Sequence, residues 1–253
     1  MTTEWPERLW IVRHGQSAGN VARDLASASN EDRIPIDQRD VDVPLSALGE
    51  EQAQALGRWF AGASAEDRPD VLLCSPYVRA RQTADLFRLA GGAQADEAIC
   101  GDERLREKEF GILDGLTVSG IHHLQPEQAE FRRLLGKFYH RPPGGESWCD
   151  VILRLRSLMD TVSLHYAGRR VMIFAHQVVV LCLRTIIEKL DEATILAIDR
   201  QGDVANCGVT EYRHVQGARG GKLDLVYYNV TAPVEAEGTP ITREPDRAAG
   251  TRA

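Results

Sequence analysis

The stretch Leu9-Trp10-Ile11-Val12-Arg13-His14-Gly15 organises the whole sequence, because an apolar run ends abruptly on an arginine, a histidine and a glycine. Four apolar residues are too few for a core helix, so we expect a buried parallel strand. In open α/β sheets, ligands bind outside the carboxyl ends of such strands. Arg13 offers a planar fork of donors for an anion, and His14 can act as acid, base or nucleophile. The stretch therefore predicts a reactive imidazole delivered to a binding loop.

Two further apolar runs end in a similar way. Residues 70–74 lead into Ser75-Pro76, and a helix is expected from about Tyr77 to Leu89 with Arg79 in its first turn. Residues 169–175 end on His176, and a helix is expected over 178–190. Strands that alternate with helices predict an α/β fold, here a three-layer α/β/α sandwich with a mostly parallel sheet of about six strands.

The rest of the chain supplies the remaining elements. Ser46 is expected to cap a helix that ends near Gly62, and a strong apolar stripe predicts another helix over 148–162. Residues 101–117 read as a charged, irregular loop, and 119–138 as one helix or a pair separated at Pro126. Late edge strands are expected at 209–214 and 223–228. Residues 21–43 show no helical or strand period and read as a surface excursion, either a lid or an insertion.

The composition sets the organisation and the class of partner. We expect one domain over 1–230 and a disordered tail over 231–253, where Pro, Glu, Thr, Arg and Ala replace apolar residues. The 253 residues carry a formal net charge of -7, which argues against nucleic acid or an anionic membrane as a partner. Five widely spaced cysteines without metal-ligand pairing, and no long apolar run, indicate a reduced, cytoplasmic chain.

The groups at the strand ends suit phosphoryl transfer. That reaction needs a nucleophile, cations that hold the non-bridging oxygens and an acid that protonates the leaving oxygen. His14 and His176 are candidates for the first two roles, and the charged loop offers Glu107 as the acid, with Glu103 and Glu109 as neighbouring alternatives.

Four motifs in order resemble the histidine phosphatase superfamily, in the branch of phosphoglycerate mutases and fructose-2,6-bisphosphatases. Arg13-His14-Gly15 with Ser17 and Asn20 matches its Arg-His-Gly-Glu-Ser-x-x-Asn element, except that Gln16 replaces glutamate. Residues 42–53, 75–84 and 105–111 match the following three elements.

The resemblance implies a role for each matching residue. His14 would be the nucleophile that forms a phosphohistidine, and Glu107 would donate the proton and later help to activate water. The remaining residues would hold the phosphoryl oxygens: Arg13, Asn20, Arg79 and His176. Two arginines and a histidine already supply the positive charge, so we expect neither a metal nor a cofactor.

One departure favours hydrolysis over isomerisation. Most of the superfamily has glycine after the second histidine, whereas Gln177 stands here and resembles the bisphosphatases. Gln177 is therefore also a candidate substrate-binding residue. We therefore expect a metal-independent phosphatase acting on a phosphomonoester of a small metabolite. The alternatives are a cofactor-dependent phosphoglycerate mutase and a phospho-ligand binding protein without turnover. The substrate and the oligomeric state stay open.

Arg133 and Lys137 suggest where the rest of the substrate binds. In a helix they lie four apart on one face. Counted back from Gly145-Glu146-Ser147, they fall where the fructose-2,6-bisphosphatases hold the distal phosphate of the sugar. The alternative is an ordinary solvated helix face.

Overall fold

The computed structural model describes residues 5–93, 98–217 and 221–243. Within these residues, six strands form one sheet in the order β3-β2-β4-β1-β5-β6. The strands are β1 (Arg8–Arg13), β2 (Val71–Cys74), β3 (Ile99–Gly101), β4 (Arg170–Ala175), β5 (Val209–Val215) and β6 (Lys222–Val230). Strands β3, β2, β4 and β1 are parallel, and β5 and β6 continue the sheet antiparallel. The predicted mostly parallel α/β sheet is confirmed.

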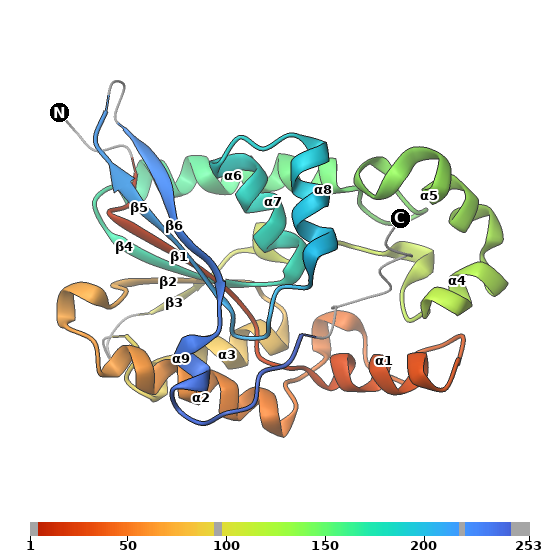
Figure 1. The fold of residues 1–253 in the computed structure, drawn as a ribbon, viewed down its shortest axis with the longest axis horizontal. Helices are drawn as coiled ribbons and strands as arrows, with labels where there is room; N and C mark the ends of the chain where they lie inside the picture. Colours follow the sequence, from red (N-terminus) through yellow and green to blue (C-terminus); the bar gives the residue numbers. More distant parts are fainter. Residues whose placement is uncertain (1–4, 94–97, 218–220, 244–253) are drawn as a thin grey trace.

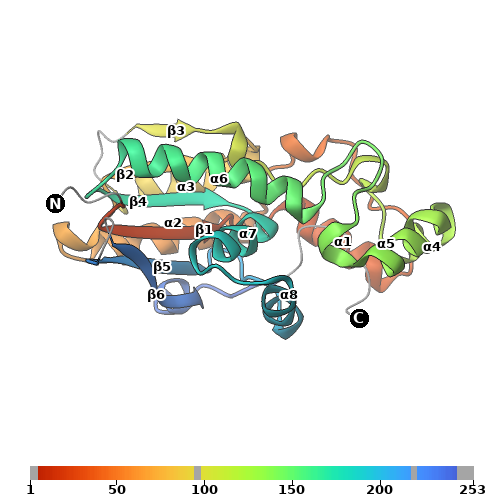
Figure 2. The ribbon, with the colours of Figure 1, turned by 90° about the horizontal axis from the view of Figure 1, so that it is seen from above.

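Helices cover both faces of the sheet, as Figure 1 and Figure 2 show. One face carries α6 (Trp148–His165) and α7 (Gln177–Ile187). The other carries α2 (Ala47–Ala61), α3 (Val78–Leu89) and the short α9 (Ala232–Glu235). This arrangement confirms the three-layer sandwich.

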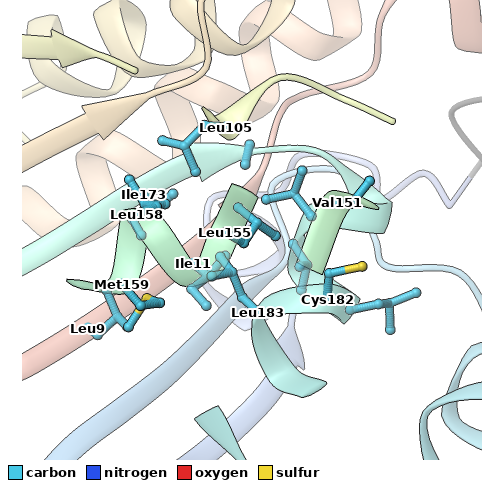
Figure 3. Packing of buried hydrophobic residues seen from close by; sticks show 14 of the residues in the cluster. Leu9, Ile11, Leu105, Val151, Leu155, Leu158, Met159, Ile173, Cys182 and Leu183 are labelled. Atoms are coloured by element: carbon cyan, nitrogen blue, oxygen red, sulfur yellow. The ribbon is translucent and has the colours of Figure 1, made fainter. Parts of the chain in front are cut away.

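Strand β1 lies at the centre of both layers. Leu9 and Ile11 pack against α6 and α7, whereas Trp10 and Val12 pack toward α2 and α3. All four side chains are at most 1% exposed. Figure 3 shows the first of these layers, with Leu9 and Ile11 among side chains of α6 and α7. Because burial of each large apolar side chain contributes about 1.5–3 kcal/mol, β1 is fixed firmly in the sheet, and so is the residue that follows it.

The remaining helices gather beyond the carboxyl ends of the parallel strands (Figure 1). They are α1 (Ala18–Ala28), α4 (Val118–Leu124), α5 (Pro126–Tyr139) and α8 (Glu192–Gln201). Single 3-10 turns lie at η1 (Asp40–Asp42), η2 (Ala65–Asp67), η3 (Glu103–Leu105) and η4 (Gly111–Leu113). The predicted restart at Pro126 is confirmed, since α5 begins there. No helix in the described ranges is long and apolar enough to cross a membrane.

Three expectations are corrected. Residues 21–28 of the supposed excursion belong to α1 (Ala18–Ala28), whose buried side chains are Asn20, Arg23 and Ala26, so no apolar period marks the helix. The strand at 209–215 is not an edge strand, because it pairs with both β1 and β6. The expected tail contains α9, and Gln52 donates to the carbonyl of Pro240 at 2.9 Å. Residues 244–253 of that tail lie outside the described residues.

Candidate active site

His14 follows β1 directly, and its hydrogen bonds select one tautomer. Its side chain is fully buried. Nδ1 lies 2.6 Å from the carbonyl oxygen of Gly15, which can only accept, so Nδ1 carries the proton. Nε2 lies 3.2 Å from Nε of Arg79, which can only donate, so Nε2 presents its lone pair. This neutral imidazole, with Nε2 unprotonated, has the form required of a nucleophile.

The loop after His14 is held closely against the start of α2. A Cβ atom at Gly15 would lie 2.4 Å from the carbonyl oxygen of Gly49, so only glycine fits at position 15. The amide of Gly15 donates to Oγ1 of Thr83, which in turn donates to the carbonyl of Arg79. The loop after His14 and the first turn of α3 are thereby joined by side-chain and backbone bonds.

His176 lies beside His14, as the convergence of strand ends predicts. The two rings have their centroids 5.2 Å apart. Nε2 of His176 is 2.8 Å from Oγ of Ser75, and the ring of Tyr77 packs edge-on against it at 5.1 Å. His176 directly follows β4 and Ser75 directly follows β2, so the parallel pairing of these two strands brings the two side chains together.

Arg13 and Asn20 lie on either side of His14 in sequence, and both are buried. The guanidinium of Arg13 donates to the carbonyl of Val204. Oδ1 of Asn20 accepts from the amide and hydroxyl of Ser17 at 2.9 and 3.0 Å, so its side-chain amide nitrogen is the group suited to donate to an oxyanion. The bond from the amide of Ser17 and the bond from the amide of Asn20 to Oγ of Ser17, 3.1 Å long, form the capping box of α1.

The helix starts add a field that favours an anion. Ser17 is the N-cap residue of α1, in the loop that follows β1, and His176 occupies the N-cap position of α7, directly after β4. A helix N-terminus carries partial positive charge and free amide groups. An oxyanion at this edge of the sheet would meet helix starts as well as guanidinium groups.

Glu107 is distinguished from its two acidic neighbours by its position. It is fully buried, and its Oε1 accepts from the amide of Lys108 at 2.7 Å. Glu103 is exposed. Glu109 is half-buried, and its carboxylate accepts from the amides of Phe110 and Gly111. Glu107 is therefore the best placed of the three to act as the acid.

Two observations describe how Glu107 is placed relative to Tyr77, beside His176, and how its loop is held. Burial, together with the charges of Asp40, Glu109 and Glu107, raises the pKa of Tyr77 to about 12. The acid loop is also fastened from α6, because Arg154 donates to the carbonyl of Glu107 at 3.2 Å.

Gln177 is the first residue of α7, and its side-chain amide nitrogen is bonded to Asp203. Nε2 donates to Oδ1 of Asp203 at 2.7 Å, on the loop that follows α8. Its role toward substrate stays a prediction.

Arg133 and Lys137 do not share one continuous helical face. Gly136 takes φ 78° and ψ 163°, a left-handed conformation that interrupts α5 between them. Arg133 is exposed and pairs with Glu130, whereas Lys137 pairs with Asp199. Both still border a cavity of about 430 Å³ between α4, α5 and α8. The geometric premise of a shared helical face is wrong, and a role in substrate binding stays a prediction.

Sequence reasoning missed two cations near the acid loop. Lys108 is 5% exposed, and its ammonium lies 4.3 Å from the ring centre of Phe110. In the described part of the chain, neither Lys108 nor Arg132 has a carboxylate within ion-pair distance. Burial, with the charge of Arg132, lowers the pKa of Lys108 to about 8. A lysine between Glu107 and Glu109 looks solvated in the sequence, so only its burial identifies it.

No group of three or more His, Cys, Asp or Glu side chains within the described ranges could hold a metal ion. The expectation that no metal takes part stays a prediction, which chelation can test.

Comparisons with known proteins agree with this geometry. The model of the histidine phosphatase superfamily (branch 1) matches residues 9–228. The 6-phosphofructo-2-kinase/fructose-2,6-bisphosphatase of Caenorhabditis elegans is 30% identical over 70% of this chain, which spans 33% of that protein. A probable phosphoglycerate mutase GpmB of Serratia proteamaculans (strain 568) is 26% identical over 83% of the chain and 86% of its own length.

Among solved structures, a mycobacterial glucosyl-3-phosphoglycerate phosphatase is similar with a TM-score of 0.68 and 27% identity, over 88% of this chain and 99% of that one. The phosphatase structures at 26–27% identity and the family match together support phosphatase activity on a small phosphorylated substrate. The chain belongs to the histidine phosphatase superfamily, branch 1.

Proposed function

We propose that this protein hydrolyses a phosphomonoester of a small metabolite, without a metal, through a phosphohistidine on His14. The observation that carries the proposal is the pair of hydrogen bonds on the imidazole, with Nδ1 on the carbonyl of Gly15 and Nε2 facing Arg79. A nucleophile needs one unprotonated nitrogen and its other nitrogen held in place, and the two bonds support this role because Nδ1 is held and Nε2 is unprotonated.

The chemistry divides between two steps. Nε2 of His14 attacks phosphorus, and the bond from phosphorus to the leaving oxygen breaks. The protonated carboxyl of Glu107 gives its proton to that oxygen, and the guanidinium groups of Arg13 and Arg79 stabilise the charge on the equatorial oxygens. Water then attacks phosphorus as Glu107 accepts its proton, and inorganic phosphate leaves with His14 restored.

Two features favour hydrolysis over transfer between isomers. Gln177 follows the second histidine as in the bisphosphatases, and a phosphatase is among the similar structures that exceed 25% identity. A mutase must instead retain the phosphoryl group and exclude water. Because probable mutases are among the relatives, isomer exchange must be measured alongside phosphate release.

The substrate carries a second anionic group in this proposal. Lys108 and Arg132 lie close together, since the charge of Arg132 lowers the pKa of Lys108. The charges of both cations also lower the pKa of His140. Burial of cations without an acid partner is costly, and a ligand carboxylate or phosphate would relieve that cost. Arg133 and Lys137, by contrast, already have acid partners.

The test is a screen for phosphate release from p-nitrophenyl phosphate, phosphoglycerates and sugar bisphosphates, with EDTA present. We expect release in EDTA and inhibition by vanadate, whose trigonal-bipyramidal adducts imitate the transition state. Conversion of 3-phosphoglycerate to its isomer without free phosphate would show a mutase. Tight phosphate binding with no turnover of any substrate would show a binding protein, and activity that EDTA abolishes and a divalent metal restores would refute metal independence.

A further inference from the structure

Asp40 contacts the pocket although it lies outside every motif that the family resemblance covers. Its carbonyl oxygen accepts from Nη1 of Arg79 at 2.6 Å. Its carboxylate meets both terminal nitrogens, with Oδ1 3.2 Å from Nη1 and Oδ2 3.2 Å from Nη2. The two side chains are only 3% (Arg79) and 16% (Asp40) exposed, so this ion pair is held largely away from solvent.

The guanidinium of Arg79 is thus fixed from two directions. Its terminal nitrogens face Asp40, and its Nε faces Nε2 of His14. Because a guanidinium is planar and rigid, an acceptor pair on its far end decides where its Nε–H points. The ring of Tyr77, 5.0 Å from Cζ, adds a contact on a further side.

Asp40 is itself attached to the framework. Its turn, η1, packs against α3, and the segment before it is bonded to the 115–117 loop. The amide of Ile34 donates to the carbonyl of Gly115, and the amide of Thr117 donates to the carbonyl of Asp32. This segment can therefore hold an arginine in place.

We propose that Asp40 is a positioning residue that acts through Arg79, holding the guanidinium so that Nε–H lies over the attacking nitrogen of His14. An incoming phosphoryl oxygen then accepts the hydrogen bond that Nε–H of Arg79 otherwise donates to His14, and the arginine does not have to rotate. The proposal rests on the proposed function for its reaction, but its contact with Arg79 can be tested by binding alone.

Three variants test the proposal on p-nitrophenyl phosphate. Asp40→Ala should lower kcat/KM at least tenfold, with more of the loss in kcat than in KM, because orientation matters most in the transition state. Asp40→Asn should recover part of the loss, since its amide oxygen still accepts one hydrogen bond. Asp42→Ala is the matched control, because Asp42 lies on the same turn and pairs with the exposed Arg39, and it should stay within twofold of wild type.

A double-mutant cycle separates positioning from a general structural effect. In an Arg79→Ala background, Asp40→Ala should change kcat/KM by less than twofold, because the residue through which it acts is gone. The same loss in both backgrounds, or no loss in wild type, would overturn the proposal. So would tighter phosphate binding with unchanged kcat, which would make Asp40 a competitor for Arg79.

Vanadate binding, measured by calorimetry, requires no turnover. Asp40→Ala should weaken it at least fivefold while Asp42→Ala leaves it unchanged. If the wild type binds vanadate but releases no phosphate from any ester, the proposed function fails while the positioning role is still decided by this binding difference. If Asp40→Ala and wild type bind vanadate equally, the positioning role fails whatever the turnover.

Discussion

The proposed phosphoryl pocket around His14 and the α5 region are both rich in cations, yet they hold them in opposite ways. In the pocket, the side chain of Arg79 is 3% exposed and has its guanidinium fixed by His14 and Asp40. On α5, the side chain of Arg133 is 68% exposed and pairs with Glu130, three residues earlier on the same helix. The first arrangement is built between elements far apart in the sequence, and the second is local and solvated.

This difference separates two kinds of positive charge. A cation fixed at the edge of a buried sheet can stabilise a charge that develops at one defined point. An exposed pair on a helix contributes little, with a typical value of about 0.2–0.5 kcal/mol. Between the two extremes lie Lys108, which is buried, and Arg132, which is half-buried, and in the described part of the chain neither has a carboxylate within ion-pair distance.

Loss of the acid in the pocket should lower activity far more than loss of any cation around α5. Glu107→Gln should lower kcat about 10²–10⁴-fold for an alkyl phosphate, whose leaving oxygen needs a proton. The loss should be far smaller for p-nitrophenyl phosphate, because nitrophenolate leaves without one. Glu103→Gln serves as the control, since Glu103 is exposed. Equal losses on the two substrates would contradict the role of Glu107 as a proton donor.

Removal of the buried ammonium of Lys108 should affect substrates that carry a second anionic group and spare those that do not. Lys108→Met should lower kcat/KM for 3-phosphoglycerate about tenfold, provided that ester is hydrolysed, and leave p-nitrophenyl phosphate within twofold. If the screen finds a better doubly anionic ester, that ester is the probe. Arg133→Ala should leave both substrates within twofold, because that side chain is solvated. The reverse pattern would restore Arg133 as the residue that binds the distal anion.

The same substitution should stabilise the fold. Folding lowers the pKa of Lys108 from its ordinary 10.5 to about 8, so the buried charge costs free energy at neutral pH. Because one pKa unit corresponds to about 1.4 kcal/mol, this cost is about 3 kcal/mol. Thermal unfolding at pH 7 should therefore show a higher Tm for Lys108→Met than for wild type, and a lower Tm would mean that the ammonium is satisfied in the folded protein.

The pH dependence should give the smallest and most specific signal. Lys108 is charged below pH 8 and neutral above it, so kcat/KM for a doubly anionic ester should fall as the pH rises through about 8. The groups that act on this ammonium are Arg132, Glu107, Glu146 and Cys182. Between pH 8 and 10.5 the unfolded chain binds more protons at this residue, so its contribution to stability rises with pH. If kcat/KM of the Lys108→Met variant still falls near pH 8, that fall is caused by the titration of another group.

The sequence predicted the pocket better than its surroundings, for a physical reason. His14 and His176 each follow the last residue of a buried strand, so the register of the sheet alone places them side by side. Arg79 is in the first turn of a helix that starts from a third such strand. Positions of this kind depend on local sequence and on parallel pairing, both of which leave a recognisable pattern.

Other features depend on partners that no local pattern names. Helix α1 buries Asn20 and Arg23, so its inner face looks polar. Asp40 gains its importance from Arg79, 39 positions later in the chain. The break at Gly136 separates two cations that an unbroken helix would place together. In each case tertiary packing overrode what spacing alone indicates.

The most direct test of the account is the covalent intermediate. Wild-type protein mixed with a turned-over phosphomonoester and quenched at alkaline pH should carry one acid-labile phosphoryl group, which peptide mapping places on His14. His14→Ala should carry none and should lose turnover by at least about 10⁴-fold. A phosphoryl group mapped to His176 instead, or one that still forms on the His14→Ala variant, would contradict the central claim that His14 is the nucleophile.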